Sequence, residues 1–185
     1  MSNVKKYLLT AVILGSIAMA SGLLIGATNL VTKDPIVKNE QRKISKGLSE
    51  IYDQEIVVAY EDDVPEEQNK VNEIKYVEHY YEINDTNDTC IGIAFRTTGS
   101  NSYGKVSLII GFDAQGIYKD LSVITNEQSF ASTLVKGYIN PLHEAENKKA
   151  AMAEVNCGAT YGAKLVRSMI DNAQKAFPYF MSRQK

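Results

Sequence analysis

The sequence predicts an α+β protein with one N-terminal membrane-spanning helix, a largely antiparallel sheet and a C-terminal helix. Three observations predict this class: a long uncharged apolar segment opens the chain, segments rich in tyrosine and β-branched residues fill the middle, and helical periodicity marks the end. Strands that precede helices favour a segregated α+β arrangement. The 185 residues, 44% of them hydrophobic, give room for one domain of ordinary size.

The N-terminal apolar segment has the length of a membrane span. No charged residue lies between Lys6 and Lys33, and the 25 residues 7–31 exceed the roughly 20 that cross a bilayer as a helix. The tripeptide Ala18-Met19-Ala20 has the small-x-small form of a signal-peptidase site. Because the apolar run continues well beyond it, an uncleaved anchor is favoured over a cleaved signal peptide.

Charges and small residues around the span give its predicted orientation and neighbours. Lys5 and Lys6 precede the span, which favours a cytoplasmic N-terminus and an ectodomain on the outer face of the cell membrane. Ala18, Gly22 and Gly26 recur every four residues. This spacing lets another transmembrane helix approach closely, although small residues are also common in membrane spans in general.

The predicted organisation is a short inner tail with the anchor (1–32), a stalk helix (33–54) and an ectodomain (55–185). Apolar residues at Ile44, Leu48 and Ile51 among many charges predict an amphipathic stalk. In the ectodomain the composition predicts strands over 55–60, 75–83 and 90–97, and a hairpin of 106–112 with 117–124. The acidic segment 61–70 is predicted as a solvated loop. Helical patterns follow from Phe130, over 144–153 and after Gly158.

Several functions are excluded or disfavoured by composition and spacing. The near balance of 20 basic and 22 acidic residues predicts no nucleic-acid partner. Two histidines and two cysteines without ligand spacing predict no metal site. The segment Gly99–Lys105 resembles a phosphate-binding loop, but Val106 replaces the required Ser or Thr and a strand follows, which favours a turn. Cys90 and Cys157 leave a disulfide and two free thiols as open alternatives.

The segment Glu154–Tyr161 leads into the terminal helix and carries the most informative pattern. Small residues at 157–159 let the backbone approach a ligand closely. Free amides at a helix N-terminus form a site suited to phosphate. The alternative is that the Thr160 hydroxyl only caps the helix.

Cys157-Gly158-Ala159-Thr160 resembles the Ser/Thr-Gly-Ala-Thr signature of the FMN-binding domain in the G subunit of the Rnf complex and the C subunit of the sodium-pumping NADH:quinone reductase. The single span, the Lys-Asp-Pro sequence at 33–35 and the hairpin at 109–116 follow the same arrangement. The resemblance implies that a flavin transferase attaches FMN through its phosphate to Thr160. It also implies other membrane subunits of an Rnf-type complex as partners, and no catalytic residue in this chain.

Further cofactor-binding residues follow from the same resemblance. Lys164, one turn after Thr160, would help neutralise the phosphate, and Tyr161 or Phe130 would pack on the flavin ring; an exposed lysine and core aromatics are the alternatives. The implied set is Cys157, Gly158, Ala159, Glu127, Gln128, Ser129, Phe130, Tyr161 and Lys164.

The sequence departs from the family pattern at three places. Glu154 stands where the transferase motif usually begins with Asp, Cys157 replaces Ser or Thr, and residues 127–130 replace a Thr-Pro-Gly-Leu-Gly segment near the flavin. The resemblance implies a membrane-anchored flavoprotein that relays electrons in a redox-driven, ion-translocating oxidoreductase complex. The alternatives are a stand-alone extracellular FMN electron carrier or reductase domain, and a membrane-tethered assembly domain without flavin.

Overall fold

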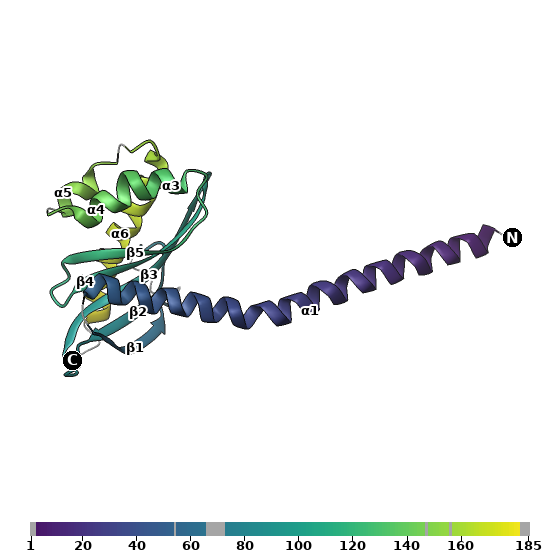
Figure 1. Ribbon diagram of the computed structural model, residues 1–185, viewed down its shortest axis with the longest axis horizontal. Coiled ribbons are helices and arrows are strands. Elements are labelled where there is room, and N and C mark those ends of the chain that lie inside the picture. The colour runs from purple at the N-terminus through teal and green to yellow at the C-terminus, as the bar shows by residue number, and fades with distance from the viewer. Residues whose placement is uncertain (1–2, 54, 66–72, 147, 156, 182–185) are drawn as a thin grey trace. The chain divides into compact units, whose positions relative to one another are not determined.

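The computed structural model describes residues 3–53, 55–65, 73–146, 148–155 and 157–181. It divides into two compact units, residues 1–42 and 43–185, and each is described by itself. Its helices and antiparallel sheet confirm the predicted α+β class (Figure 1). Residues 66–70 of the predicted loop, and Asn156 of the predicted turn, lie outside the described residues.

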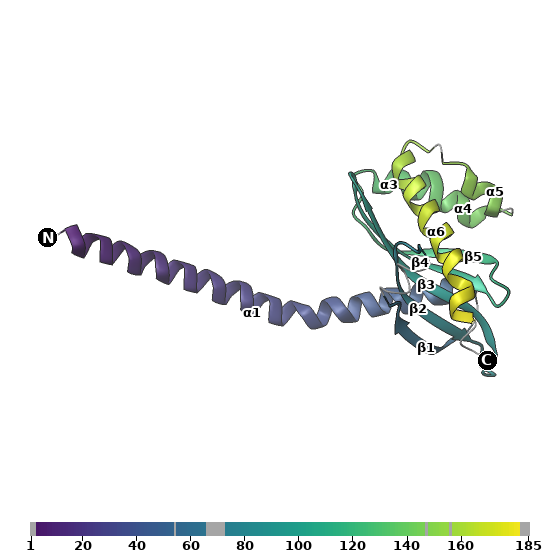
Figure 2. The same ribbon diagram turned by 180° about the vertical axis from the view of Figure 1, so that it is seen from behind.

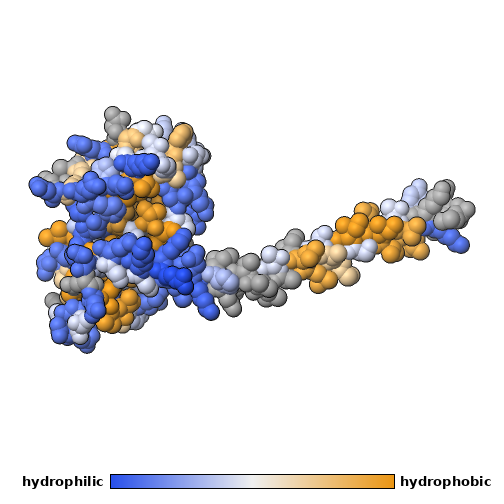
Figure 3. All heavy atoms as spheres, viewed as in Figure 1, coloured by the Kyte–Doolittle hydropathy of each residue, from blue (hydrophilic) through white to orange (hydrophobic). Residues whose placement is uncertain are grey.

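The first unit consists of most of helix α1, which runs from Asn3 to Tyr52. Its segment Tyr7–Leu24 is long and apolar enough to cross a membrane, and none of it is buried. Figure 3 shows apolar side chains on the surface of this part of the helix. The segment is therefore compatible with single-pass membrane anchoring. The helix continues through Pro35, so the Lys-Asp-Pro sequence does not end it.

The second unit contains one five-stranded antiparallel sheet in which neighbours in sequence are neighbours in space. The strands are β1 (Val57–Asp63), β2 (Val77–Asn84), β3 (Cys90–Asn101), β4 (Gly104–Asp113) and β5 (Tyr118–Asn126). The predicted loop at 61–63 is wrong, because these residues continue β1 and pair with residues 79–81 of β2. As an edge strand β1 exposes every side chain, so its acidic residues remain in water.

Both faces of the sheet are covered, which explains why its central strands are almost continuously apolar. One face packs against helix α6 (Thr160–Met181), whose Ala163, Val166 and Ile170 are fully buried with Phe95 and Ile110 of the sheet. The other face packs against the last turns of α1, where Leu48 and Ile51 are buried with Ala94, Ile109 and Ile124. Figure 2 shows α6 lying across its face of the sheet.

Four short helical segments connect β5 to α6: α3 (Ala131–Leu134), the π-helix η1 (Val135–Ile139), α4 (Asn140–Glu144) and α5 (Lys148–Ala153). The prediction of helix from Phe130 onwards is confirmed, although its change of period to a π-helix was not predicted. The predicted helix over 144–153 is shorter than expected, since Glu144 ends α4 and α5 begins at Lys148.

The end of α1 is fixed to the sheet by Tyr52. Its hydroxyl donates a hydrogen bond to the Phe112 carbonyl at 3.0 Å, and its ring is 2% exposed. A Cβ atom at Gly92 would lie 2.9 Å from the Tyr52 ring, and one at Gly111 would lie 2.4 Å from Ile51. Glycine at these two positions therefore makes room for the last turn of α1.

A cluster of charged groups joins the connecting helices to β5. The Asp120 carboxylate lies 2.6 Å from His143 Nδ1 and 2.7 Å from Lys148 Nζ. Lys148 also donates a hydrogen bond to the His143 carbonyl at 3.0 Å. Burial by itself raises the pKa of Asp120, but the hydrogen bonds from His143 and Lys148 outweigh it and hold that pKa below its ordinary value.

We expect Asp120→Asn to lower the free energy of unfolding at pH 7 by about 1–3 kcal/mol, since a partly buried, charge-assisted cluster loses its anion. A carboxyl group whose pKa is lowered on folding stabilises the fold above its unfolded pKa of about 3.9, and this stabilisation is lost as the pH falls further. The difference between wild type and variant should therefore shrink in urea titrations below about pH 4. Asp171→Asn, at an exposed position of α6, is the control. A difference that is the same at every pH would contradict this assignment.

Candidate functional site

The N-terminus of α6 is formed by a glycine turn and a buried alanine. Gly158 has a φ of +73°, a left-handed conformation that favours glycine, and Ala159 is 7% exposed. The first hydrogen bond of the helix runs from the Ala163 amide to the Ala159 carbonyl at 3.0 Å. The amides of Thr160, Tyr161 and Gly162 precede it and so have no acceptor within the helix. Because Ala159 carries no side-chain oxygen, it cannot cap them as Ser or Asp would.

The turn before α6 lies against the π-helix η1. A Cβ atom at Gly137 would lie 3.0 Å from both the Cβ and the carbonyl oxygen of Cys157, and the Thr133 methyl lies 3.4 Å from the Cβ position of Gly158. Cys157 is a half-buried free thiol, and Cys90 lies on β3, where its thiol donates a hydrogen bond to the Gly92 carbonyl at 3.8 Å. Cys157 therefore contributes packing that sets the course of the backbone into α6. π-Helical turns in proteins are often found at functional sites, and here one forms the support for this turn.

Gln128 connects this helix N-terminus to the sheet. Its side chain is 7% exposed and donates hydrogen bonds to Asn101 Oδ1 at 3.0 Å and to the Gly104 carbonyl. Asn101 in turn donates to the carbonyl of Tyr161 at 3.3 Å. The buried Gln128 amide fixes the local structure, because a movement that broke either hydrogen bond would leave a buried polar group unpaired at a cost in free energy.

The segment containing Gln128 is also held through its backbone. The Glu127 amide donates to the Lys105 carbonyl and the Ser129 amide to the Tyr103 carbonyl, both at 2.8 Å. Gly104 has a φ of +132°, and a Cβ atom there would lie 2.2 Å from the Glu127 carbonyl oxygen. Only glycine allows this close approach between the tip of the β3–β4 hairpin and residues 127–129.

These segments enclose a cavity of about 220 Å³ at the start of α6. Six residues predicted from the sequence line it, and the structure adds three more. The predicted ones are Gln128, Phe130, Gly158, Ala159, Thr160 and Tyr161, and the additional ones are Tyr103, Leu134 and Gly162.

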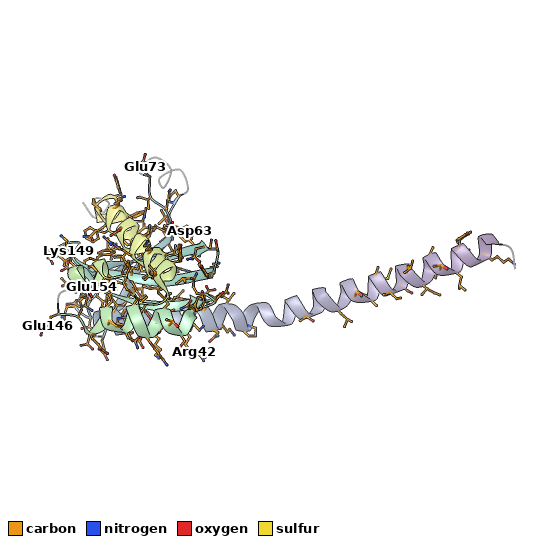
Figure 4. The ribbon with its side chains drawn as sticks, turned by 90° about the horizontal axis from the view of Figure 1, so that it is seen from above. Arg42, Asp63, Glu73, Glu146, Lys149 and Glu154 are labelled. Atoms are coloured by element: carbon orange, nitrogen blue, oxygen red, sulfur yellow. The ribbon has the colours of Figure 1, made fainter. Side chains whose placement is uncertain are left out.

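Four other predicted residues lie near the cavity without lining it. Cys157 packs beside it, and Glu127 and Ser129 are exposed residues that take part through their backbone. Lys164 is exposed on α6. Glu154 is also exposed, and Figure 4 shows it on the same side of the second unit as Glu146 and Lys149.

Tyr103 lines the cavity but is not among the residues that the sequence predicts for the site. The sequence predicts a turn over Gly99–Lys105, and the structure confines it to residues 102–103, because residues 99–101 and 104–105 belong to the paired strands β3 and β4. An aromatic side chain at the tip of such a tight hairpin lies away from the hydrophobic core. Its presence there in the sequence indicates a role at the surface. That it reaches the start of α6 depends on long-range packing.

The residues at the cavity fit a phosphate group in three respects. Thr160 offers a half-buried hydroxyl, the first turn of α6 offers amides without an intrahelical acceptor, and the turn at 157–159 has no bulky side chain. Helix N-termini favour anions through these amides and the helix dipole. The described residues contain no group of three or more His, Cys, Asp or Glu side chains placed to hold a metal ion.

Comparison with known protein families gives one match. Residues 1–51, which comprise nearly all of α1, match the family described as the RnfG N-terminal region. The match covers 51 of the 185 residues, so the likeness to RnfG proteins is shown for this N-terminal region. No curated protein matches the chain significantly.

We expect Gln128→Ala to lower the free energy of unfolding by about 1–3 kcal/mol, because Asn101 and the Gly104 carbonyl lose a buried donor. Glu127→Ala is the matched control at the adjacent, exposed position, and it should change that free energy by less than about 0.5 kcal/mol. Urea denaturation followed by circular dichroism measures both. Equal effects of the two substitutions would show that Gln128 does not have the anchoring role described above.

Proposed function

We propose that this RnfG-type protein is a membrane-anchored flavoprotein subunit of an ion-translocating, Rnf-type oxidoreductase complex. Electrons would be relayed through FMN that is joined by its phosphate to the Thr160 hydroxyl. The observation that carries the cofactor assignment is the position of Thr160. It lies in the first turn of a helix whose apolar face is buried, on the wall of a cavity that is also lined by three aromatic residues. The RnfG-type N-terminal region supports the assignment to the complex.

The residues around Thr160 have distinct roles in this proposal. The amides at the start of α6 hold the phosphate, and the left-handed Gly158 leaves room for it. Cys157 packs against Gly137 and holds the turn in place, a role that its small side chain fills as Ser or Thr would. When bound, FMN supplies the one- and two-electron chemistry, and the protein supplies its position and local polarity.

A covalent phosphoester suits a site of this kind. The cavity is small and open to solvent on a domain that we place on the outer face of the membrane, where unattached cofactor would be lost by dilution. A flavin transferase that recognises the segment from Glu154 to Thr160 would form the ester: the Thr160 oxygen bonds to the FMN phosphorus and loses its proton, the phosphoanhydride bond of an activated FMN donor breaks, and the rest of the donor leaves. Glu154 is exposed and therefore accessible to such an enzyme.

The membrane-spanning segment gives this subunit its partners in the proposal. Lys5 and Lys6 keep the N-terminus in the cytoplasm. Gly22 in the span has no atom of the described structure within 4 Å of its Cβ position, so this face is open to a helix of another subunit.

We expect Thr160→Ala to abolish covalent flavin while the domain still folds, because the substitution removes only the hydroxyl and the γ-methyl group of a half-buried side chain. The measurement is flavin fluorescence of the denatured protein band after coexpression with a flavin transferase, together with circular dichroism of the native protein. Thr133→Ala is the matched control, since Thr133 is an exposed threonine beside the same turn. Covalent flavin on the Thr160→Ala variant would contradict the assignment of this residue.

The same preparation separates the proposal from its alternatives. A flavin-bearing protein that leaves mild detergent extraction with other membrane subunits supports the Rnf-type complex. A flavin-bearing protein that emerges alone indicates a stand-alone electron carrier. A colourless wild-type protein, made with an active transferase, indicates a membrane-tethered assembly domain.

A further inference from the structure

Three exposed aromatic rings meet beside Thr160, each from a different segment of the chain. Tyr103 lies at the tip of the β3–β4 hairpin, Phe130 precedes α3, and Tyr161 is in the first turn of α6. The Tyr103 ring centroid is 5.9 Å from that of Phe130 and 5.5 Å from that of Tyr161, and the two tyrosine rings are stacked at 30°. Tyr103 is therefore the central ring of this aromatic cluster.

The cluster does not serve the hydrophobic core. Tyr103, Phe130 and Tyr161 are 38%, 53% and 65% exposed, whereas the neighbouring Leu134 is fully buried. None of the three belongs to either core cluster. Large aromatic side chains that converge on a cavity while remaining in water form a surface suited to a flat aromatic ligand.

The backbone of Tyr103 is held in place before any ligand arrives. Its amide donates to Asn101 Oδ1 at 2.9 Å, and its carbonyl accepts from the Ser129 amide at 2.8 Å and the Ser129 hydroxyl at 3.2 Å. The hairpin tip is thus tied to residues 127–129, with Gly104 allowing the close approach. Because its backbone is held and its ring contacts Phe130 and Tyr161, Tyr103 loses little conformational freedom when it stacks on another ring.

We propose that Tyr103, which is already stacked on Tyr161, is the positioning residue on which the isoalloxazine ring of FMN stacks, with Phe130 tilted beside it. The inference rests on the proposed attachment of FMN to Thr160 and adds a residue from a distant hairpin to that site. It assigns a ring-binding role to Tyr103, in addition to the Phe130 and Tyr161 that the sequence indicates. Tyr103 takes no part in forming the phosphoester, so attachment and ring position are separable.

The test uses the full chain coexpressed with a flavin transferase, as wild type and as Tyr103→Leu, Tyr103→Phe and Tyr179→Leu. Peptide mass spectrometry measures FMN on Thr160, and time-resolved flavin anisotropy with iodide quenching measures the freedom and exposure of the ring. Tyr179 is a matched control because it is 40% exposed and lies about 28 Å from Thr160 along α6. Circular dichroism checks that each variant folds. We expect all of them to fold because Tyr103 and Tyr179 are both exposed.

Tyr103→Leu should keep its FMN but lower the ratio of docked to mobile ring about 2- to 10-fold, the effect of losing one aromatic pair. Tyr103→Phe should retain the anisotropy of wild type because the stacking face remains, and Tyr179→Leu should match wild type. Equal anisotropy and iodide quenching of wild type and Tyr103→Leu, with FMN attached to both, would overturn this inference alone. Absence of FMN from wild-type Thr160 would overturn the proposed function and this inference with it.

Discussion

The burial of α6 against the sheet is the constraint from which the geometry of the site follows. Ala163, Val166, Met169, Ile170 and Ala173 are all fully buried, so the helix can neither rotate nor slide without exposing this apolar face. Its first residue, Thr160, is therefore held in place by contacts that extend along most of the helix. The glycine turn before it and the Gln128 hydrogen bonds beside it fix the remaining geometry.

Much of the fold could be predicted from the sequence because its signals are local. The terminal helix shows its period through Ala163, Val166 and Ile170, and the β4–β5 hairpin through its Gly116 turn. The assignment of residues 61–63 to a loop failed because acidic residues are tolerated on an edge strand, where the backbone pairs but the side chains stay in water. Local composition does not reveal which backbone segment will pair with a neighbouring strand.

The site was predicted in its sequence-contiguous parts only. Residues 157–161 could be predicted from three small residues followed by a helix start, and Gln128 and Phe130 from the resemblance to the FMN-binding domain family. Tyr103 and Gly137 reach the site through the β3–β4 hairpin and the π-helix, respectively. Their roles depend on contacts between segments far apart in the chain, which no periodicity encodes. Glu154 and Cys157, which depart from the family pattern, are compatible with the geometry of the site. Glu154 is exposed, and Cys157 packs against Gly137, where a small side chain is required.

The central claim is that Thr160 carries FMN through a phosphoester, and mass spectrometry of the native protein from its own membranes tests it most directly. The account predicts an intact mass increased by one FMN less one water, located on the peptide that contains Thr160. An unmodified Thr160 peptide, from cells in which the flavin transferase is active, would contradict it.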